Sequence, residues 1–316
     1  MRFDAPPVVC IVGPTASGKS DLAQAVALAL DSEVVSADSM QIYRGMDIGT
    51  GKVLPEDRLV PHHGIDLVDP GDPYSAALFQ SYARTCFSDI RTRGKRPVLA
   101  GGTGLYVRAA IDDLDFPKGD QINNPIRERY MRYAEEHGAR KLWDELDRVD
   151  ADSAALIHPH NVRRVVRAFE MISEGTSYAE QHKRLQMLPQ AVPALLFGLA
   201  VDPAVLTDRI DRRVDAMIEA GLVAEVKSLL HHGFRGGITA PQAIGYKEIV
   251  EAIDETVSFE DAIEQIKTAT RRYAKRQRTW FKKDARIVWL DADEADTAHL
   301  AEQVVSQVLE SDAAMT

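Results

Sequence analysis

An eight-residue glycine-rich segment near the N-terminus constrains the fold of this chain more than any other feature. Residues 13–20 read GPTASGKS and match the pattern G-x-x-x-x-G-K-[ST]. The segment follows a short apolar run at residues 8–12 and precedes a helical pattern at residues 21–30. A segment of this kind between a strand and a helix is typical of a phosphate-binding loop, and it predicts an α/β fold.

The loop also predicts a specific chemistry. Glycine lets the main chain wrap closely around a phosphate, while successive N–H groups and the helix N-terminus supply positive potential. Lys19 adds a point charge, and Ser20 adds a hydroxyl ligand for Mg²⁺. A glycine-rich turn without a ligand is the alternative. The expected phosphate-binding residues are Gly13, Pro14, Thr15, Ala16, Ser17, Gly18, Lys19 and Ser20.

The phosphate loop does not name a reaction, because ATPases, kinases and other enzymes that bind ATP or a diphosphate share it. A hydrolytic NTPase would end a second apolar strand in an aspartate that holds the metal ion. The candidate strand at residues 96–100 is followed instead by GGTG at residues 101–104. The expected aspartate is therefore missing from this place.

Four further short apolar runs have the pattern of buried strands in a parallel sheet, because Gly, Pro or Asp bounds them and helical patterns separate them. They lie at residues 33–37, 96–100, 195–201 and 287–290. We therefore predict a P-loop NTPase-like parallel sheet flanked by helices. Later helical patterns lie at residues 203–220, 222–231, 241–253, 259–283 and 299–309.

A change of pattern marks a second domain. Residues 114–193 contain no convincing strand and carry charged amphipathic patterns instead, at residues 124–137, 139–148 and 161–173. We predict an all-helical insertion of residues 114–196 in an α/β catalytic core formed by residues 1–113 and 197–316.

Composition bounds the cellular context. The 316 residues carry a formal charge of −10, which argues against a generic nucleic-acid coat but not against a local basic groove. Apolar runs are too short to span a membrane, and the first residues do not resemble a signal peptide, so we expect a cytoplasmic protein with no membrane partner. Cys10 and Cys86 are the only cysteines, so we expect neither a disulfide framework nor a cysteine zinc site.

The charge is distributed unevenly. Residues 271–283 hold seven cations and no acid, interleaved with Tyr273, Trp280 and Phe281, whereas residues 291–316 hold seven acids and no Lys or Arg. This distribution predicts one basic groove, although a charge run is usually a solvated face and the two later aromatic residues could equally be core. Two further arginine groups lie on the insertion. They are Arg163, Arg164 and Arg167, and Arg127, Arg129 and Arg132. Two histidine pairs, at residues 62–63 and 231–232, are interpreted as structural because no Asp, Glu or Cys set completes a zinc site.

Several motifs occur in an order that resembles the tRNA dimethylallyltransferase family. After the phosphate loop, SADSMQIYRGMDIGT follows at residues 36–50. The later motifs, which extend the resemblance over roughly residues 8–283, are HHGIDLVDPGDPYSAALF at 62–79, AGGTGLYV at 100–107, HPHNVRRVVRAFE at 158–170, RIDRRVDAMIEAGLVAEV at 209–226, QAIGYKE at 242–248 and AKRQRTWF at 274–281. The tail lacks the zinc finger that eukaryotic members often carry, and so the bacterial form is the better match.

The resemblance implies that a dimethylallyl group moves from its diphosphate to N6 of adenosine 37 in tRNA, releasing diphosphate. It implies catalytic roles for Lys19 and Arg213, which contact the donor diphosphate, for Asp38 as the general base and for Thr103 near the reacting groups. Taken alone, Arg213 would be interpreted as a solvated helix arginine, Asp38 as a metal-associated or structural aspartate and Thr103 as a helix cap.

The resemblance and the basic segments together predict the residues that contact the anticodon loop. They are Asp38, Ser39, Met40, Gln41, Thr103, Arg127, Asn161, Val162, Arg163, Arg164, Val165, Arg167, Gln242, Ala243, Ile244, Gly245, Tyr246, Lys247, Lys275 and Arg276. The expected partners are tRNA and dimethylallyl diphosphate, the expected cofactor is Mg²⁺, and the expected state is a monomer.

Three alternatives stay open on sequence. An adenylate isopentenyltransferase shares the donor but uses free AMP, ADP or ATP. A phosphate-loop kinase of a small metabolite would turn over ATP. A non-catalytic RNA-binding protein would carry a decayed loop, against which the intact Lys19, Ser20 and Asp38 argue.

Overall fold

A computed structural model describes residues 6–116, 124–186, 188–293 and 296–314 of the chain. It divides into two compact units, one formed by Met1–Ile111 with Gln190–Thr316 and the other by Asp112–Pro189. The sequence pattern placed this boundary at residues 114 and 196. The structure places it earlier, because the N–H groups of Ala191 and Val192 donate to the carbonyl of Ile111 at 2.8 and 3.0 Å and tie that segment to the first unit.

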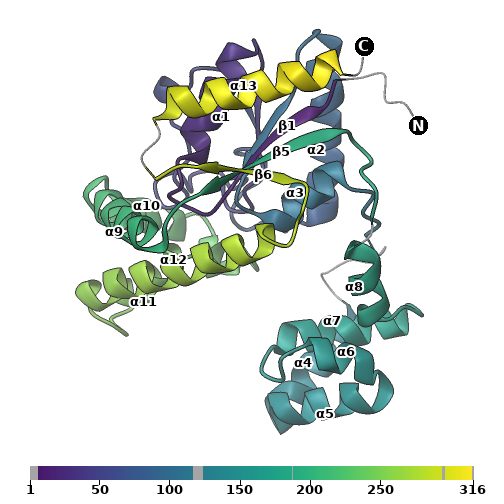
Figure 1. The fold of residues 1–316 in the computed structure, drawn as a ribbon. Helices are drawn as coiled ribbons and strands as arrows, with labels where there is room; N and C mark the ends of the chain where they lie inside the picture. The colour runs from purple at the N-terminus through teal and green to yellow at the C-terminus, as the bar shows by residue number, and fades with distance from the viewer. Residues whose placement is uncertain (1–5, 117–123, 187, 294–295, 315–316) are drawn as a thin grey trace. The chain divides into compact units, whose positions relative to one another are not determined.

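The first unit is built on a six-stranded sheet in the order β3-β2-β4-β1-β5-β6, with every pair parallel (Figure 1). The predicted parallel α/β class is confirmed. Its strands are β1 (Val8–Val12), β2 (Val34–Ser36), β3 (His62–His63), β4 (Val98–Gly101), β5 (Ala194–Ala200) and β6 (Ile287–Asp291). Five of them were predicted, and β3 was missed because two residues carry no periodic pattern.

Helices cover both faces of this sheet. On one face α1 (Lys19–Ala29) packs against α13 (Thr297–Ala313), and on the other α2 (Ala76–Thr92) packs against α3 (Gly104–Ile111). With both faces covered, β1 is buried at all five of its residues, which explains its uninterrupted apolar sequence. The carboxyl ends of β1, β2 and β4 consequently meet at one edge, where the connecting loops carry the polar motifs.

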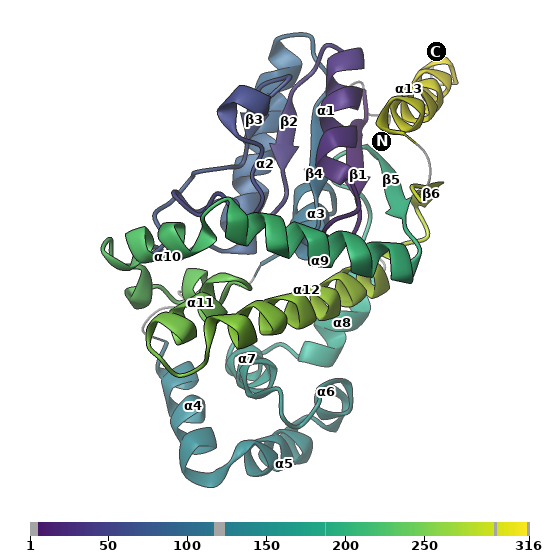
Figure 2. The same cartoon turned by 90° about the vertical axis from the view of Figure 1, so that its left-hand side faces the viewer.

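Four α-helices and two short 3-10 helices separate β5 from β6, and Figure 2 shows α9 and α12 lying side by side. The 3-10 helices are Phe234–Gly236 and Ala240–Gln242. The α-helices are α9 (Pro203–Glu219), α10 (Leu222–Leu230), α11 (Tyr246–Ile253) and α12 (Phe259–Phe281). The sequence pattern placed the start of α11 at residue 241, which is wrong. Gly245 adopts a φ of +92°, and its N–H donates to Glu248 Oε2 at 2.8 Å, so the helix begins only after this glycine.

In the described residues of the second unit the named elements are all helices, joined by short connecting segments. The helices are α4 (Pro125–His137), α5 (Ala139–Val149), α6 (Ala151–Leu156), α7 (Val162–Ser173) and α8 (Tyr178–Gln186). Leu142, Leu146 and Val165 are fully buried in its own apolar core, and Tyr130 stacks on Phe169 with ring centroids 3.9 Å apart. Residues 117–123 of the predicted insertion lie outside the described residues.

Within the described parts of the chain, no helix combines the length and apolar character needed to cross a membrane.

Candidate active site

The phosphate loop lies between β1 and α1, as its motif predicts. Ala16 and Gly18 adopt positive φ values of 62° and 87°, and Lys19 is the first residue of α1. The left-handed turn brings successive main-chain N–H groups around the N-terminus of the helix. Lys19 and Ser20 both line a cavity at this point.

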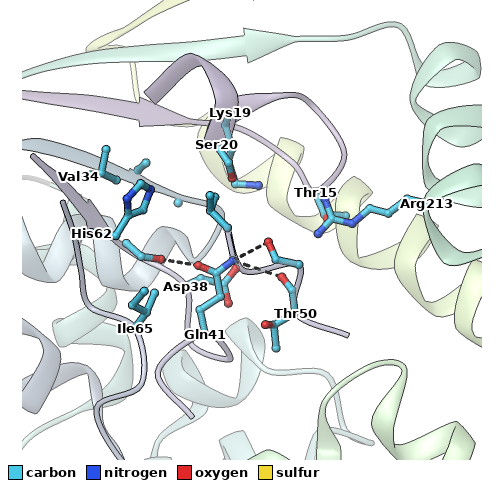
Figure 3. A pocket seen from close by; sticks show the side chains of 15 residues that line it. Thr15, Lys19, Ser20, Val34, Asp38, Gln41, Thr50, His62, Ile65 and Arg213 are labelled. Atoms are coloured by element: carbon cyan, nitrogen blue, oxygen red, sulfur yellow. Dashed lines mark hydrogen bonds between the residues drawn. The ribbon is translucent and has the colours of Figure 1, made fainter. Parts of the chain in front are cut away.

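The cavity lies outside the carboxyl ends of the strands, where parallel α/β sheets bind their ligands. It is enclosed by the loops that follow β1, β2 and β4 and by one side chain from α9, Arg213. Figure 3 shows this arginine reaching across to Thr15 of the phosphate loop. Lys19, Asp38 and Arg213 therefore share one cavity although they come from three different elements.

Two half-buried cations face this cavity without a carboxylate partner among the described residues. Lys19 Nζ donates only to the carbonyl of Pro14 at 3.3 Å, and within the described residues neither Lys19 nor Arg213 has an ion pair within 4.0 Å. Burial lowers the pKa of Lys19 to about 8, with Asp38 opposing this shift and Arg213 adding to it. Burial likewise lowers the pKa of Arg213, opposed by Asp38 and Asp21. Such a pair favours binding of a multiply charged anion.

Hydrogen bonds fix the Asp38 side chain within its own loop and join that loop to Thr103. Asp38 Oδ1 accepts from the N–H of Met40 at 2.9 Å. The Thr103 hydroxyl accepts from the N–H of Ser39 at 3.1 Å and donates to the Ser39 hydroxyl at 3.3 Å. The side chain of Thr103 thus binds the Asp38 loop, whereas the sequence left open that it caps a helix.

Gln41 lines the interior of the cavity. Its side-chain oxygen accepts from the Ser36 hydroxyl at 2.8 Å, and its nitrogen donates to the carbonyls of Thr50 and Gly51, both at 3.3 Å. Gln41 therefore joins the end of β2 to the loop at residues 50–51, both of whose residues line the cavity. The sequence predicted Gln41 as a tRNA contact and gave no role to Thr50 or Gly51.

A carboxylate on α10 binds the main chain just before this loop, at residues 47–49. Glu225 accepts hydrogen bonds from the N–H groups of Asp47, Ile48 and Gly49 at 3.0, 2.8 and 3.3 Å. The Tyr246 hydroxyl donates to the same carboxylate at 2.6 Å. Tyr246 was predicted as a tRNA contact, but its side chain is fully buried and acts here as part of this clamp.

A second cavity of about 300 Å³ adjoins the first and is more apolar. Thr15, Asp38 and Arg213 line both cavities, so the two meet at the predicted base. The predicted residues Ser39, Met40, Gln242, Ala243, Ile244, Gly245, Tyr246 and Arg276 line the second cavity together with apolar side chains of α9 and α12. This arrangement separates a polar, cationic pocket from an apolar one, with Asp38 between them.

The sequence matches two families of known proteins. A family model described as "IPP transferase" matches residues 41–284, and one described as "Isopentenyl transferase" matches residues 6–60. The chain belongs to the IPP transferase family. It is 44% identical to the tRNA dimethylallyltransferase of Carboxydothermus hydrogenoformans, over 95% of this chain and 96% of that relative, and 44% identical to that of Bacillus subtilis, over 90% of each.

Solved structures agree with the sequence comparison. A tRNA delta(2)-isopentenylpyrophosphate transferase from Staphylococcus epidermidis is 37% identical, with a TM-score of 0.71 over 97% of this chain and 100% of that one. A eukaryotic dimethylallyltransferase described as acting on tRNA is 29% identical, with a TM-score of 0.77 over 98% of this chain and 80% of that one. The predicted family is therefore confirmed, and this member of the IPP transferase family is a prenyl-transferring enzyme.

In the helical unit of this IPP transferase, some of the predicted arginines form ion pairs and others are exposed. Glu170, which is 1% exposed, accepts from Arg127 Nε at 2.6 Å and from Arg167 Nη1 at 2.8 Å, so Arg127 holds α4 to α7 and Arg167 pairs with Glu170 within α7. Arg163 and Arg164 are exposed. Asn161 caps α7 by accepting from the N–H of Arg164, Val162 is the first residue of that helix, and the Val165 side chain is buried in the core.

The basic segment on α12 is also mixed. Arg271 pairs with Asp211 on α9, whereas Lys275 and Arg276 are exposed, with Arg276 over the ring of Tyr273 at 5.6 Å. The sequence left open whether Trp280 and Phe281 belong to the basic groove or to the core. Phe281 is buried, while Trp280 is 42% exposed. Lys247, also a predicted tRNA contact, forms a surface pair with Glu251 at 3.5 Å.

Sequence reasoning missed a histidine in this site. His62, interpreted as purely structural, lines the first cavity beside Val34, to which it is paired in the sheet (Figure 3). Burial lowers its pKa, and its Nδ1 contacts the carbonyl of Val60 at 2.9 Å. Its neighbour His63 contacts Glu33 at 2.7 Å and is structural, as expected. Only the parallel pairing of the short β3 with β2 brings His62 to the cavity.

The site suits Mg²⁺ carried by a phosphate substrate. Within the described residues, no three His, Cys, Asp or Glu side chains form a cluster that holds a metal ion by itself. Mg²⁺ keeps several waters and commonly binds through one or two protein groups plus substrate phosphates. The Ser20 hydroxyl, at the start of α1 and on the cavity wall, is a donor of this kind.

Proposed function

We propose that this chain transfers the dimethylallyl group of dimethylallyl diphosphate to N6 of adenosine 37 in tRNA and releases diphosphate. The observation that carries the proposal is the pair of half-buried cations, Lys19 and Arg213, which share one cavity with Asp38. The names of the relatives, which describe tRNA dimethylallyltransferases, support tRNA as the acceptor.

The phosphate loop and Arg213 bind the donor diphosphate. As the allylic C–O bond breaks, negative charge grows on the leaving diphosphate. Cations fixed at that position stabilise the transition state more than the ground state, because the charge they face is larger there. Their partial burial strengthens this effect, since water screens the interaction less than it does at an exposed site. When bound at Ser20, Mg²⁺ supplies further positive charge to the same leaving group.

Asp38 acts on the acceptor. The lone pair of N6 is delocalised into the purine, so a base takes its proton as the new C–N bond forms. Asp38 lines both the cationic and the apolar cavity, and so it lies between the two substrates. A carboxylate within hydrogen-bond reach of N6 is sufficient for this step. The Thr103 hydroxyl is hydrogen-bonded to Ser39 and so fixes the position of the Asp38 loop relative to the donor.

An adenine in an anticodon loop must be unstacked before it reaches Asp38, at a cost of a few kcal/mol. We propose that the exposed cations Arg163, Arg164, Lys275 and Arg276 offset part of this cost through phosphate contacts. Binding should therefore weaken as salt concentration rises. Because the acceptor is tRNA, we also propose that the protein acts in the cytoplasm, and as a monomer.

The deciding assay incubates the protein with unmodified tRNA, dimethylallyl diphosphate and Mg²⁺, followed by nucleoside digestion and mass analysis. A gain of C5H8 on adenosine is expected. Parallel reactions with AMP, ADP or ATP as acceptor test the adenylate isopentenyltransferase, and ADP release from ATP tests the kinase. Modification of free nucleotides without modification of tRNA would refute the proposal.

Two variants assign the roles. Replacing Asp38 by Ala should abolish turnover while tRNA binding stays near the wild-type level. An equal loss of both would make Asp38 a binding residue instead. Arg213→Lys should lower kcat/KM for the donor by about 10²-fold, because a lysine cannot reproduce the planar donor set. Arg212→Lys is the matched control, since the neighbouring Arg212 lies on the same helix and pairs with Asp208 at the surface.

A further inference from the structure

A buried glutamine on α12 joins the two loops that carry the catalytic groups. The N–H of Thr15 donates to Gln277 Oε1 at 2.9 Å, and Gln277 Nε2 donates to the carbonyl of Gly102 at 2.9 Å. Thr15 belongs to the phosphate loop after β1, and Gly102 precedes Thr103 in the turn after β4. Gln277 is 5% exposed, so water does not compete for these hydrogen bonds.

The neighbouring residues fit closely around this side chain. A Cβ atom on Gly102 would collide with the Gln277 amide nitrogen, so only glycine lets the two approach. One turn earlier on α12, the Tyr273 hydroxyl lies beside Thr103 and Gln277, and burial raises the pKa of that hydroxyl to about 12. One turn later, Trp280 packs closely against Gly104. A single stripe of α12 therefore covers both loops.

The choice of an amide has a physical reason. One group must accept from an N–H and donate to a carbonyl at the same time, and a neutral amide does both without adding charge. The Gln277 side-chain nitrogen, by donating to the Gly102 carbonyl, also keeps that oxygen pointing toward α12. A free carbonyl oxygen at this point, beside the phosphate loop, would oppose binding of an anion.

We propose that Gln277 is a positioning residue for prenyl transfer. It sets the spacing between the phosphate loop, which holds the donor, and the Thr103 turn, which holds the loop of Asp38. This inference rests on the function proposed above. Reaction rates depend steeply on such spacing, since a displacement of about 1 Å can cost about 10²-fold in rate. Gln277 itself touches neither substrate in this role.

The test compares Gln277→Met, which keeps the size of the side chain but makes neither hydrogen bond, with Gln265→Met. Gln265 is exposed on the same helix and serves as the matched control. We expect Gln277→Met to lower kcat at least tenfold and to weaken binding of inorganic diphosphate about tenfold by calorimetry. The KM for tRNA should stay within twofold, and Gln265→Met should resemble the wild type.

A second variant separates positioning from folding. Gln277→Glu keeps an acceptor for the N–H of Thr15 but loses the donor to Gly102 and adds a negative charge. It should bind diphosphate more weakly than Gln277→Met. A purely structural role predicts instead that lost activity follows the unfolded fraction, measured by circular dichroism under assay conditions, and that the folded fraction retains the wild-type kcat.

The outcomes also distinguish this inference from the proposed function. If the wild type neither binds diphosphate nor modifies tRNA, the proposed function is wrong. If the wild type does both, and either Gln277 variant retains wild-type kcat and diphosphate affinity, only the positioning role is refuted.

Discussion

The guanidinium of Arg213 lies directly against the main chain of Gly51, so closely that a Cβ atom at this position would collide with Nη2. Gly51 also has a φ of +60°, and Gln41 fixes it through its carbonyl. The main chain at residue 51 therefore supports the Arg213 guanidinium at the cavity wall. A glycine is required here both for the left-handed conformation and for the space.

Gly51→Ala should displace Arg213 from the cavity. We expect the KM for dimethylallyl diphosphate to rise at least tenfold, with a loss of about 1–2 kcal/mol in stability from the left-handed conformation. Gly94→Ala is the matched control, because Gly94 has a φ of +74° but no atom within 4 Å of the added Cβ. Steady-state kinetics and thermal unfolding of both variants check this. Equal donor KM values in the two variants would contradict the steric argument.

The pKa of about 8 for Lys19 predicts a pH dependence of donor capture. Lys19 is charged below this value and neutral above it, so kcat/KM for the donor, which reports the free enzyme, should fall as pH rises through about 8. Lys19→Arg should remove this inflection, because an arginine stays charged throughout the range. A wild-type profile that stays flat to pH 9.5 would show that Lys19 does not control donor binding.

Glu225→Gln should loosen the loop at residues 47–51. The carboxylate accepts four hydrogen bonds, and an amide nitrogen placed there would face N–H donors. Loss of a charge-assisted hydrogen bond costs about 1.5–3 kcal/mol, and we expect a comparable drop in stability together with a higher donor KM. Glu219→Gln, at an exposed glutamate on α9, is the control. Denaturant unfolding and donor kinetics measure both effects, and an unchanged donor KM would restrict Glu225 to a folding role.

Glu170→Gln should destabilise the helical unit. Burial would raise the pKa of Glu170, but hydrogen bonds from Arg127 and Arg167 outweigh it and hold the pKa below its ordinary value of 4.5. The stabilisation is therefore present above pH 4.5 and is lost as pH falls through the lower folded value. We expect a loss of about 1–2 kcal/mol at pH 7, since both arginines are partly exposed. Limited proteolysis measures this loss of stability, with Glu174→Gln at an exposed glutamate as the control. A stability difference between Glu170→Gln and the wild type that is as large at pH 3 as at pH 7 would contradict the linkage.

The phosphate loop could be predicted because its chemistry is local. Eight consecutive residues supply the glycine conformations, the lysine and the hydroxyl, and the flanking strand and helix have clear periodicity. The family followed from the order of several motifs, and Asp38 and Arg213 from their places within them. The five longer strands were likewise evident from uninterrupted apolar runs, whereas the two-residue β3 was not.

The sequence by itself determined the α/β class, the family and three charged residues that line the first cavity, Lys19, Asp38 and Arg213. Only the tertiary structure decided which side chains support them. Thr15 and Gln277 are 262 positions apart in the sequence, and Asp47 and Glu225 are 178 positions apart. No local sequence pattern therefore predicts either contact. The structure also shows that the side chains of Tyr246 and Val165, both predicted as tRNA contacts, are buried. Burial and long-range hydrogen bonding depend on how distant segments meet, and that is a property of the folded chain alone.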